Sequence, residues 1–172
     1  ILLSTALRFV EEVVGEDALG VLADEAAELP APQRAALTWM ISQLETDDPV
    51  PYLVAALGAD ATEVTIAAAR GLANRPDPRA WDALRAVVVS GPAEAREPAL
   101  EAMLSILDAD EDEALADPTG SYEFALDRTQ SAANASRALL GLARHATPEM
   151  ASLVRPYIDD PDTRPAALTA FT

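Results

Sequence analysis

One helical segment recurs about every 31 residues along this chain, and this repeat restricts the possible folds more than any other feature of the sequence. Each copy has small residues at its centre and apolar residues at helical spacing on one face. The six copies can be aligned on their central alanines, which are Ala6, Ala36, Ala67, Ala99, Ala135 and Ala167. The steps between these alanines are 30, 31, 32, 36 and 32 residues. A second helical segment lies between successive copies, so the sequence predicts a helix pair as the repeating unit.

The alignment also predicts which residues of each copy are buried. Positions +1, +4 and +5 from the central alanine are mostly apolar, and they include Leu140 and Leu168. A stripe of this kind must be covered by neighbouring helices. A single helix pair cannot bury it alone, which explains why the pair recurs.

The turns between the helices contain signals for helix starts. Asp48, Asp77, Thr147 and Asp160 each precede a proline. A short polar side chain in this position accepts a hydrogen bond from an unpaired backbone N–H, and proline has no N–H to lose there. Alanine and leucine, which favour helices, supply most of the apolar residues, and aromatic residues make up only 5% of the chain. The predicted fold class is all-α.

A complete helix pair is seen in the segment EVTIAAARGLANRPDPRAWDALRAVV, which begins at Glu63. In pattern and period it resembles the short HEAT repeats that are also called PBS-lyase-like, and the resemblance covers almost the whole chain. It implies an α-α superhelix, a HEAT-like solenoid of about five helix pairs that forms a single domain over residues 1–172. Because the chain starts at Ile1 and ends at Thr172 within a helical pattern, we expect it to be a fragment of a longer protein.

One segment departs from the repeat. Residues 108–127 (DADEDEALADPTGSYEFALD) are longer than a standard step and contain Pro118 and Gly120. We expect an irregular acidic insertion here, with a short helix at 113–116 and a loop that holds Tyr122 and Phe124.

The charge of the chain limits its possible partners. It has 29 acidic residues against 12 basic ones, all of them arginine, and a net charge of −17. This charge opposes a phosphate backbone and an anionic bilayer, so we expect no nucleic acid and no membrane partner. The sequence has neither a membrane-spanning apolar run nor a leader peptide, which predicts a cytoplasmic protein. The acidic excess without lysine resembles proteins of salt-loving archaea, and the alternative is an ordinary acidic protein encoded in GC-rich DNA.

The sequence contains no catalytic or metal-binding signature. It has no cysteine, which excludes thiolate metal sites. The run DADED from Asp108 matches the start of an EF-hand loop, but Glu113 replaces the required glycine and Thr119 replaces the last glutamate. His145 is the only histidine, and no nucleophile motif accompanies it. We therefore expect no enzyme, no cofactor and no metal site.

The remaining function class is binding. In solenoids of this kind one helix series forms a concave face, and positions −2 and +2 from the central alanines should lie on it. The residues that we assign to partner contact are Arg34, Thr38, Thr65, Glu97, Glu101 and Arg137. The predicted function is a protein–protein interaction scaffold whose partner is a protein or a peptide with some basic residues. The alternatives are a HEAT-type enzyme or accessory factor that resembles bilin lyases or DNA glycosylases, a structural spacer, or an ordinary solvated face.

Overall fold

The computed structural model describes residues 18–44, 48–109, 117–145 and 150–170. These residues form α-helices and short 3-10 turns, and no strand occurs among them. The all-α prediction is confirmed. The chain divides into two compact units, residues 1–102 and 103–172, and the division falls within one helix.

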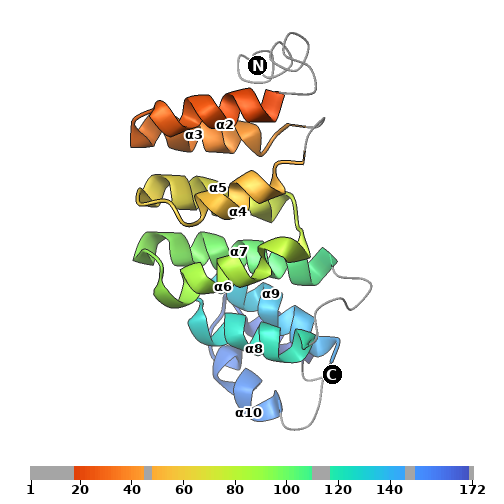
Figure 1. Ribbon diagram of the computed structural model, residues 1–172. Coiled ribbons are helices and arrows are strands. Elements are labelled where there is room, and N and C mark those ends of the chain that lie inside the picture. The colour runs from red at the N-terminus through yellow and green to blue at the C-terminus, as the bar shows by residue number, and fades with distance from the viewer. Residues whose placement is uncertain (1–17, 45–47, 110–116, 146–149, 171–172) are drawn as a thin grey trace. The chain divides into compact units, whose positions relative to one another are not determined.

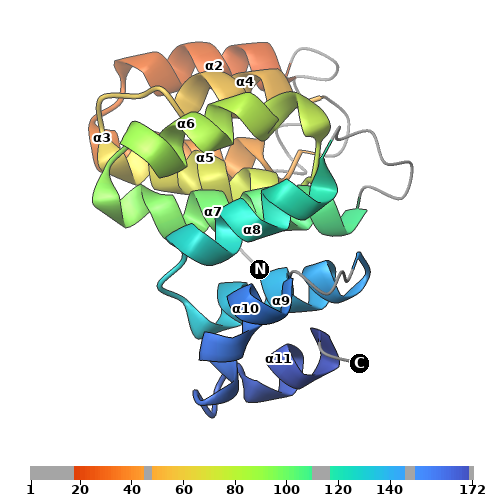
Figure 2. The same ribbon diagram turned by 90° about the horizontal axis from the view of Figure 1, so that it is seen from below.

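The first unit is built from helix pairs. Its elements are α2 (Ala18–Glu28), α3 (Ala31–Ile41), α4 (Val50–Ala56), α5 (Thr62–Asn74), η2 (Pro78–Ala80), α6 (Trp81–Ser90) and the first part of α7 (Ala93–Ala109). Figure 1 shows the pairs stacked in chain order. Figure 2 shows α2, α4 and α6 in one layer, which we call the outer layer, and α3, α5 and α7 in the other, the inner layer. Helix α3 packs against α2 and α5, and α5 also packs against α4.

The second unit contains the end of α7 and the remaining helices. These are α8 (Pro118–Arg128), α9 (Ala132–Ala143), α10 (Ala151–Val154), η4 (Arg155–Ile158) and α11 (Arg164–Ala170). Helix α9 packs against both α8 and α11, and η4 continues α10 and contacts α11.

The predicted helix-start signals are confirmed at Asp48 and Asp77, whereas Asp160 and Pro161 begin a turn and α11 starts only at Arg164. Asp48, Asp77 and Asp160 each accept a hydrogen bond from the backbone N–H two residues further on, at 3.1, 2.9 and 2.9 Å. Each bond satisfies a donor that the first turn leaves unpaired. Thr147 lies outside the described residues.

The buried positions of α3, α5, α7, α9 and α11 define a register that differs from the predicted alignment. Equivalent buried residues in these five helices are Thr38, Ala68, Ala99, Ala138 and Ala166, none more than 6% exposed. By contrast, Ala36 is exposed. Leu140 and Leu168, which we placed in the buried stripe, expose 44% and 50% of their surface. The prediction is wrong at these two leucines, because alanine occurs on several faces of these helices and its spacing permits more than one alignment. Other positions of the predicted stripe are buried as expected, among them Leu72, Leu100, Met103 and Leu139.

The segment that we expected to be an irregular insertion is helical wherever it is described. Helix α7 continues to Ala109, and α8 begins at Pro118. Asp117 accepts a hydrogen bond from the backbone N–H of Gly120 at 2.9 Å, so the proline and glycine that suggested a loop begin a helix instead. The short helix predicted at 113–116 lies outside the described residues.

Tyr122 and Phe124 therefore lie in α8 and not in a loop. Tyr122 is only 1% exposed, and its ring covers Gly141 of α9 so closely that a Cβ at Gly141 would overlap it. Gly71 of α5 is in a similar position, facing the end of α3. Glycine at these positions of α5 and α9 is thus required for close packing between helices.

Candidate protein-interaction surface

The structure places the six predicted contact residues differently from our expectation. Thr38 and Thr65 are fully buried. Arg34, Glu97 and Arg137 are half-buried, and Glu101 is exposed. Arg137 belongs to the second unit and the other five to the first. The prediction that these residues lie on an exposed face is therefore wrong for Thr38 and Thr65.

Both threonine hydroxyls are used inside the first unit. The Oγ1 of Thr38 shares a hydrogen bond with the hydroxyl of Tyr52 at 3.2 Å, which joins α3 to α4. Thr65 donates to the carbonyl of Ala59, 3.4 Å away in the turn that precedes α5. A buried hydroxyl needs such a partner, because leaving it unpaired would cost free energy. These side chains hold helix pairs together and are not available to a partner.

Arg137 is engaged in a polar cluster of the second unit. Its Nη2 donates to Oδ2 of Asp108 at 2.8 Å and to Oγ of Ser105 at 3.3 Å. Tyr122 donates through its hydroxyl to Oδ1 of the same carboxylate at 3.2 Å. Burial and, next, the charge of Asp108 raise the pKa of Tyr122 to about 12. The cluster joins α7, α8 and α9, which is a structural role.

A second ion-pair group joins successive repeats in the first unit. Arg79 donates to Oδ2 of Asp48 at 2.8 Å and to Oδ2 of Asp77 at 2.6 Å. The hydrogen bonds from Arg79 hold the pKa of both carboxyl groups below their ordinary value. Arg75 links the repeats in another way, since its Nε donates to the carbonyl of Ser42 at 2.7 Å. Arg75 and Arg79 therefore stabilise the packing of successive helix pairs.

An open apolar groove lies in the outer layer of the first unit, between α4 and α6. Its volume is about 320 Å³, room for roughly ten water molecules at liquid density. Its lining includes the half-buried Val54, the buried side chains of Leu57 and Val87, and several small residues, among them the exposed Ala55 and Ala86. No charged residue contributes to the lining.

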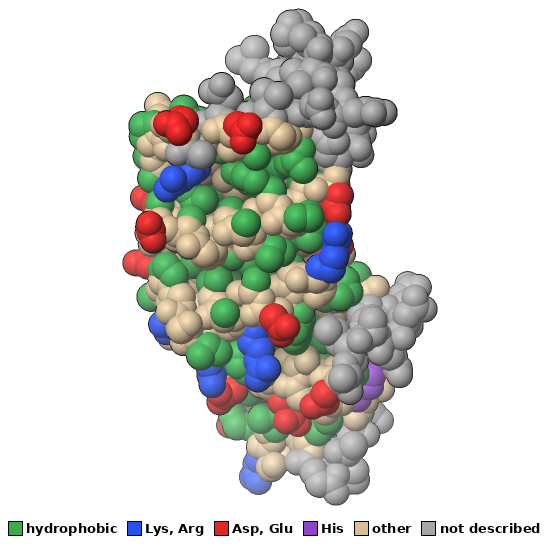
Figure 3. All heavy atoms as spheres, viewed as in Figure 1, with side chains coloured by type: hydrophobic (Ala, Val, Ile, Leu, Met, Phe, Trp, Pro, Cys, Tyr) green, Lys and Arg blue, Asp and Glu red, His purple; other side chains and the backbone are tan. Residues whose placement is uncertain are grey.

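The absence of charge extends beyond the groove itself. Residues 49–58, which include all of α4, contain no charged residue in a chain with a net charge of −17. Figure 3 shows mostly hydrophobic and uncharged side chains over α4 and the adjoining part of α6, with charged side chains toward the margins. Val89 of α6 also exposes 55% of its surface, although it does not line the groove. Exposed apolar patches on soluble proteins commonly mark interaction sites, and the cores of protein interfaces are depleted in charge.

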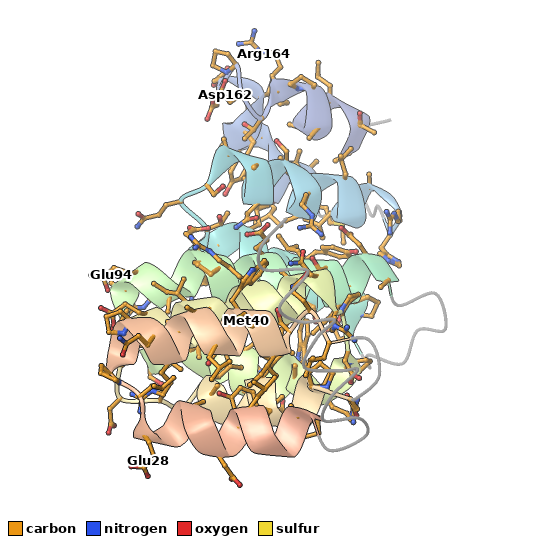
Figure 4. The ribbon with its side chains drawn as sticks, turned by 90° about the horizontal axis from the view of Figure 1, so that it is seen from above. Glu28, Met40, Glu94, Asp162 and Arg164 are labelled. Carbon is orange, nitrogen blue, oxygen red and sulfur yellow. The ribbon has the colours of Figure 1, made fainter. Side chains whose placement is uncertain are left out.

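Acidic residues lie at one end of this uncharged surface. The groove ends at Gly58 and Gly91, and the exposed residues Asp60 and Glu94 follow these glycines closely in the chain. Figure 4 shows Glu94 at the same end of the first unit as Glu28, where outer-layer helices end and inner-layer helices begin. We call Glu28, Asp60 and Glu94 the acidic edge.

Two further features bear on the class of site. Within the described ranges, no three His, Asp or Glu side chains are grouped so that they could hold a metal ion. No helix in that part of the chain is long and apolar enough to cross a bilayer.

No family model matches this chain, and no curated protein matches it. The resemblance to HEAT repeats therefore depends on the repeated sequence pattern and on the helix pairs themselves.

The groove was not predicted from the sequence, because the binding surface was expected on the inner helices. A usable signal was present. The uncharged run at 49–58 is unusual in so acidic a chain, and it leaves α4 with no charged side chain to face the solvent.

Proposed function

We propose that this chain is a protein-interaction scaffold built from HEAT-like helix pairs, and that the groove between α4 and α6 is its binding surface. The observation that carries the proposal is the uncharged, open groove in a chain with a net charge of −17. Covering apolar surface contributes about 25 cal/mol per Å². No ion has to be desolvated from the groove lining when a partner covers it, which avoids the main penalty of a charged interface.

The inner layer is a weaker candidate than the sequence suggested. Its exposed positions include Glu63 and Arg70 of α5 and Glu94 and Glu101 of α7. Exposed ion pairs contribute only about 0–1 kcal/mol each, and such charges affect the rate of encounter more than the affinity. We therefore move the proposed binding surface from the inner layer to the outer layer.

A matched pair of variants tests this function. Ala86→Glu places a carboxylate in the groove, and Ala36→Glu makes the same change at an exposed alanine of the inner-layer helix α3. Both changes keep a good helix former and add the same charge. The wild type and both variants, shown to be folded by circular dichroism, are used to capture proteins from a native lysate.

We expect specific partners that bind the wild type and Ala36→Glu but not Ala86→Glu. Partners lost with Ala36→Glu and kept with Ala86→Glu would return the binding surface to the inner layer. If the wild type captures nothing beyond what an unrelated acidic helical protein captures, the chain is a spacer and the proposal is wrong.

A further inference from the structure

We infer that the occupant of the groove is an amphipathic helix of a partner protein, with an aliphatic face about two turns long and basic residues at one end. This inference rests on the proposed function and adds the class of partner to it. It follows from the shape of the groove, the residues that line it and the charges around it.

The lining excludes the other common ways in which proteins bind peptides. Strand addition needs a free sheet edge, and the described part of the chain has no strand. Recognition of polyproline helices uses aromatic grooves, and no aromatic residue lines this one. Binding of phosphorylated or acidic peptides needs a cluster of arginines, and the lining contains no arginine. An apolar groove between two helices is the arrangement that accepts a third helix.

The small lining residues favour a helix further. Ala55 and Gly58 of the α4 side and Ala83, Ala86 and Gly91 of the α6 side add little side-chain bulk to the groove. Where contact residues are small, helix axes can approach to about 8 Å. The α6 side of the groove runs from residue 83 to residue 91, eight steps that span about 12 Å at the rise of an α-helix. About two turns of a partner helix therefore lie in contact, with its apolar residues at i, i+3 or i+4, and i+7.

The charge around the groove predicts the charge of this helix. At one end lie Asp60 and Glu94 of the acidic edge, and Asp82 lies on α6 beside the lining. The nearby cations are Arg85 and Arg96. The guanidinium of Arg96 donates to the carbonyl of Gly91 at 3.2 and 3.3 Å, so one positive charge lies at the same end of the groove as these carboxylates.

Arg79, at the other end, is bound to two carboxylates. The local charges therefore sum to a negative value within a chain whose net charge is −17. A helix with lysine or arginine at the end that reaches Asp60 and Glu94 approaches faster and binds more tightly than one with acidic ends.

A displayed peptide library tests the inference with defined probes. The library holds helical peptides of about 18 residues, long enough for partial helicity in isolation. The residues of one face vary between aliphatic and polar side chains, and both ends vary among Lys, Glu, Gln and Ala. The bait is the full 172-residue chain. Enriched peptides are then measured by fluorescence anisotropy against the wild type, Ala86→Glu and the control Ala36→Glu.

We expect enriched peptides with aliphatic residues at i, i+3 or i+4, and i+7 and with lysine at one end. They should bind Ala36→Glu as they bind the wild type and lose about tenfold or more in affinity for Ala86→Glu. Reversal of the edge charges, Asp60→Lys with Glu94→Lys, should weaken lysine-ended peptides and strengthen the same peptides with glutamate ends.

The contrary outcomes separate the inference from the proposed function. Peptides that depend on the groove but have neutral or acidic ends overturn the inference and leave the scaffold function standing. Peptides that bind Ala86→Glu as well as the wild type show that another surface binds, which overturns the groove as the site. If the peptides are enriched no more than on an unrelated acidic helical protein, both the inference and the proposed scaffold function are wrong.

Discussion

Replacement of Gly71 by alanine tests whether the inner glycines are required by packing. Gly71 lies inside α5, where alanine would normally be preferred by about 1 kcal/mol. A Cβ built there would lie 2.6 Å from the Cβ of Ser42 and 3.3 Å from the Cδ2 of Leu53. The nearer atom belongs to a short side chain fixed to the end of α3, so it cannot move aside without moving the backbone.

The expected change in the free energy of unfolding is the difference between a packing cost and a gain in helix propensity. Overpacking of a close contact costs about 1–3 kcal/mol, and the closeness of this contact places Gly71→Ala in the upper part of that range. The gain in helix propensity offsets about 1 kcal/mol of it. We expect Gly71→Ala to lose about 1–2 kcal/mol of unfolding free energy. Gly20→Ala in α2 is the matched control, because nothing lies within 4 Å of a Cβ there, and it should gain about 0.5–1 kcal/mol.

The assay is urea unfolding followed by tryptophan fluorescence. Trp39 and Trp81 both belong to the first unit, so they report on the unit that contains both glycines. Adding Ser42→Gly to Gly71→Ala removes the nearest atom and should recover part of the loss, whereas Ser42→Ala should not. If Gly71→Ala proves as stable as Gly20→Ala, the packing argument is refuted.

Three further predictions concern charged groups. Burial raises the pKa of Tyr122 to about 12 in the folded chain, so the unfolded state, with a tyrosine pKa of about 10, ionises first. Stability should fall between these pH values, and Tyr122→Phe should reduce that fall and the phenolate absorbance near pH 12; Tyr157, whose pKa burial also raises, should keep part of both. Arg79→Met should raise the pKa of Asp48 and Asp77 toward the ordinary value of 3.8. Because lowered carboxyl pKa values stabilise the fold above them and that stability is lost as pH falls, the wild type should lose more stability than Arg79→Met on acidification; unchanged carboxyl titrations by NMR would contradict this. Molar KCl should raise the thermal unfolding midpoint by screening the charge of −17, and equal midpoints at low and high salt would count against the salt-loving origin.

The candidate surface was predicted from sequence only in part. The proposal of a binding function came from the repeat and the charge, whereas the face proposed for binding did not. Thr38 and Thr65 stand at positions that a pattern of small and polar residues cannot distinguish from surface. Only their bonds to Tyr52 and Ala59 show that they are internal. The groove depends on two helices about 30 residues apart in sequence, and no local pattern states how far apart their axes lie.

Local chemistry by itself determined the helices, their recurrence as pairs, and the helix starts at Asp48 and Asp77. These features depend on propensity and on hydrogen bonds within a few residues, which the sequence states directly. The tertiary structure alone decided the exact register of the buried face in each helix. In helices this rich in alanine several faces are equally able to be covered, and the choice falls to the neighbouring helices. That choice buried Tyr122 over Gly141, left Leu140 and Leu168 exposed, and opened the uncharged groove between α4 and α6.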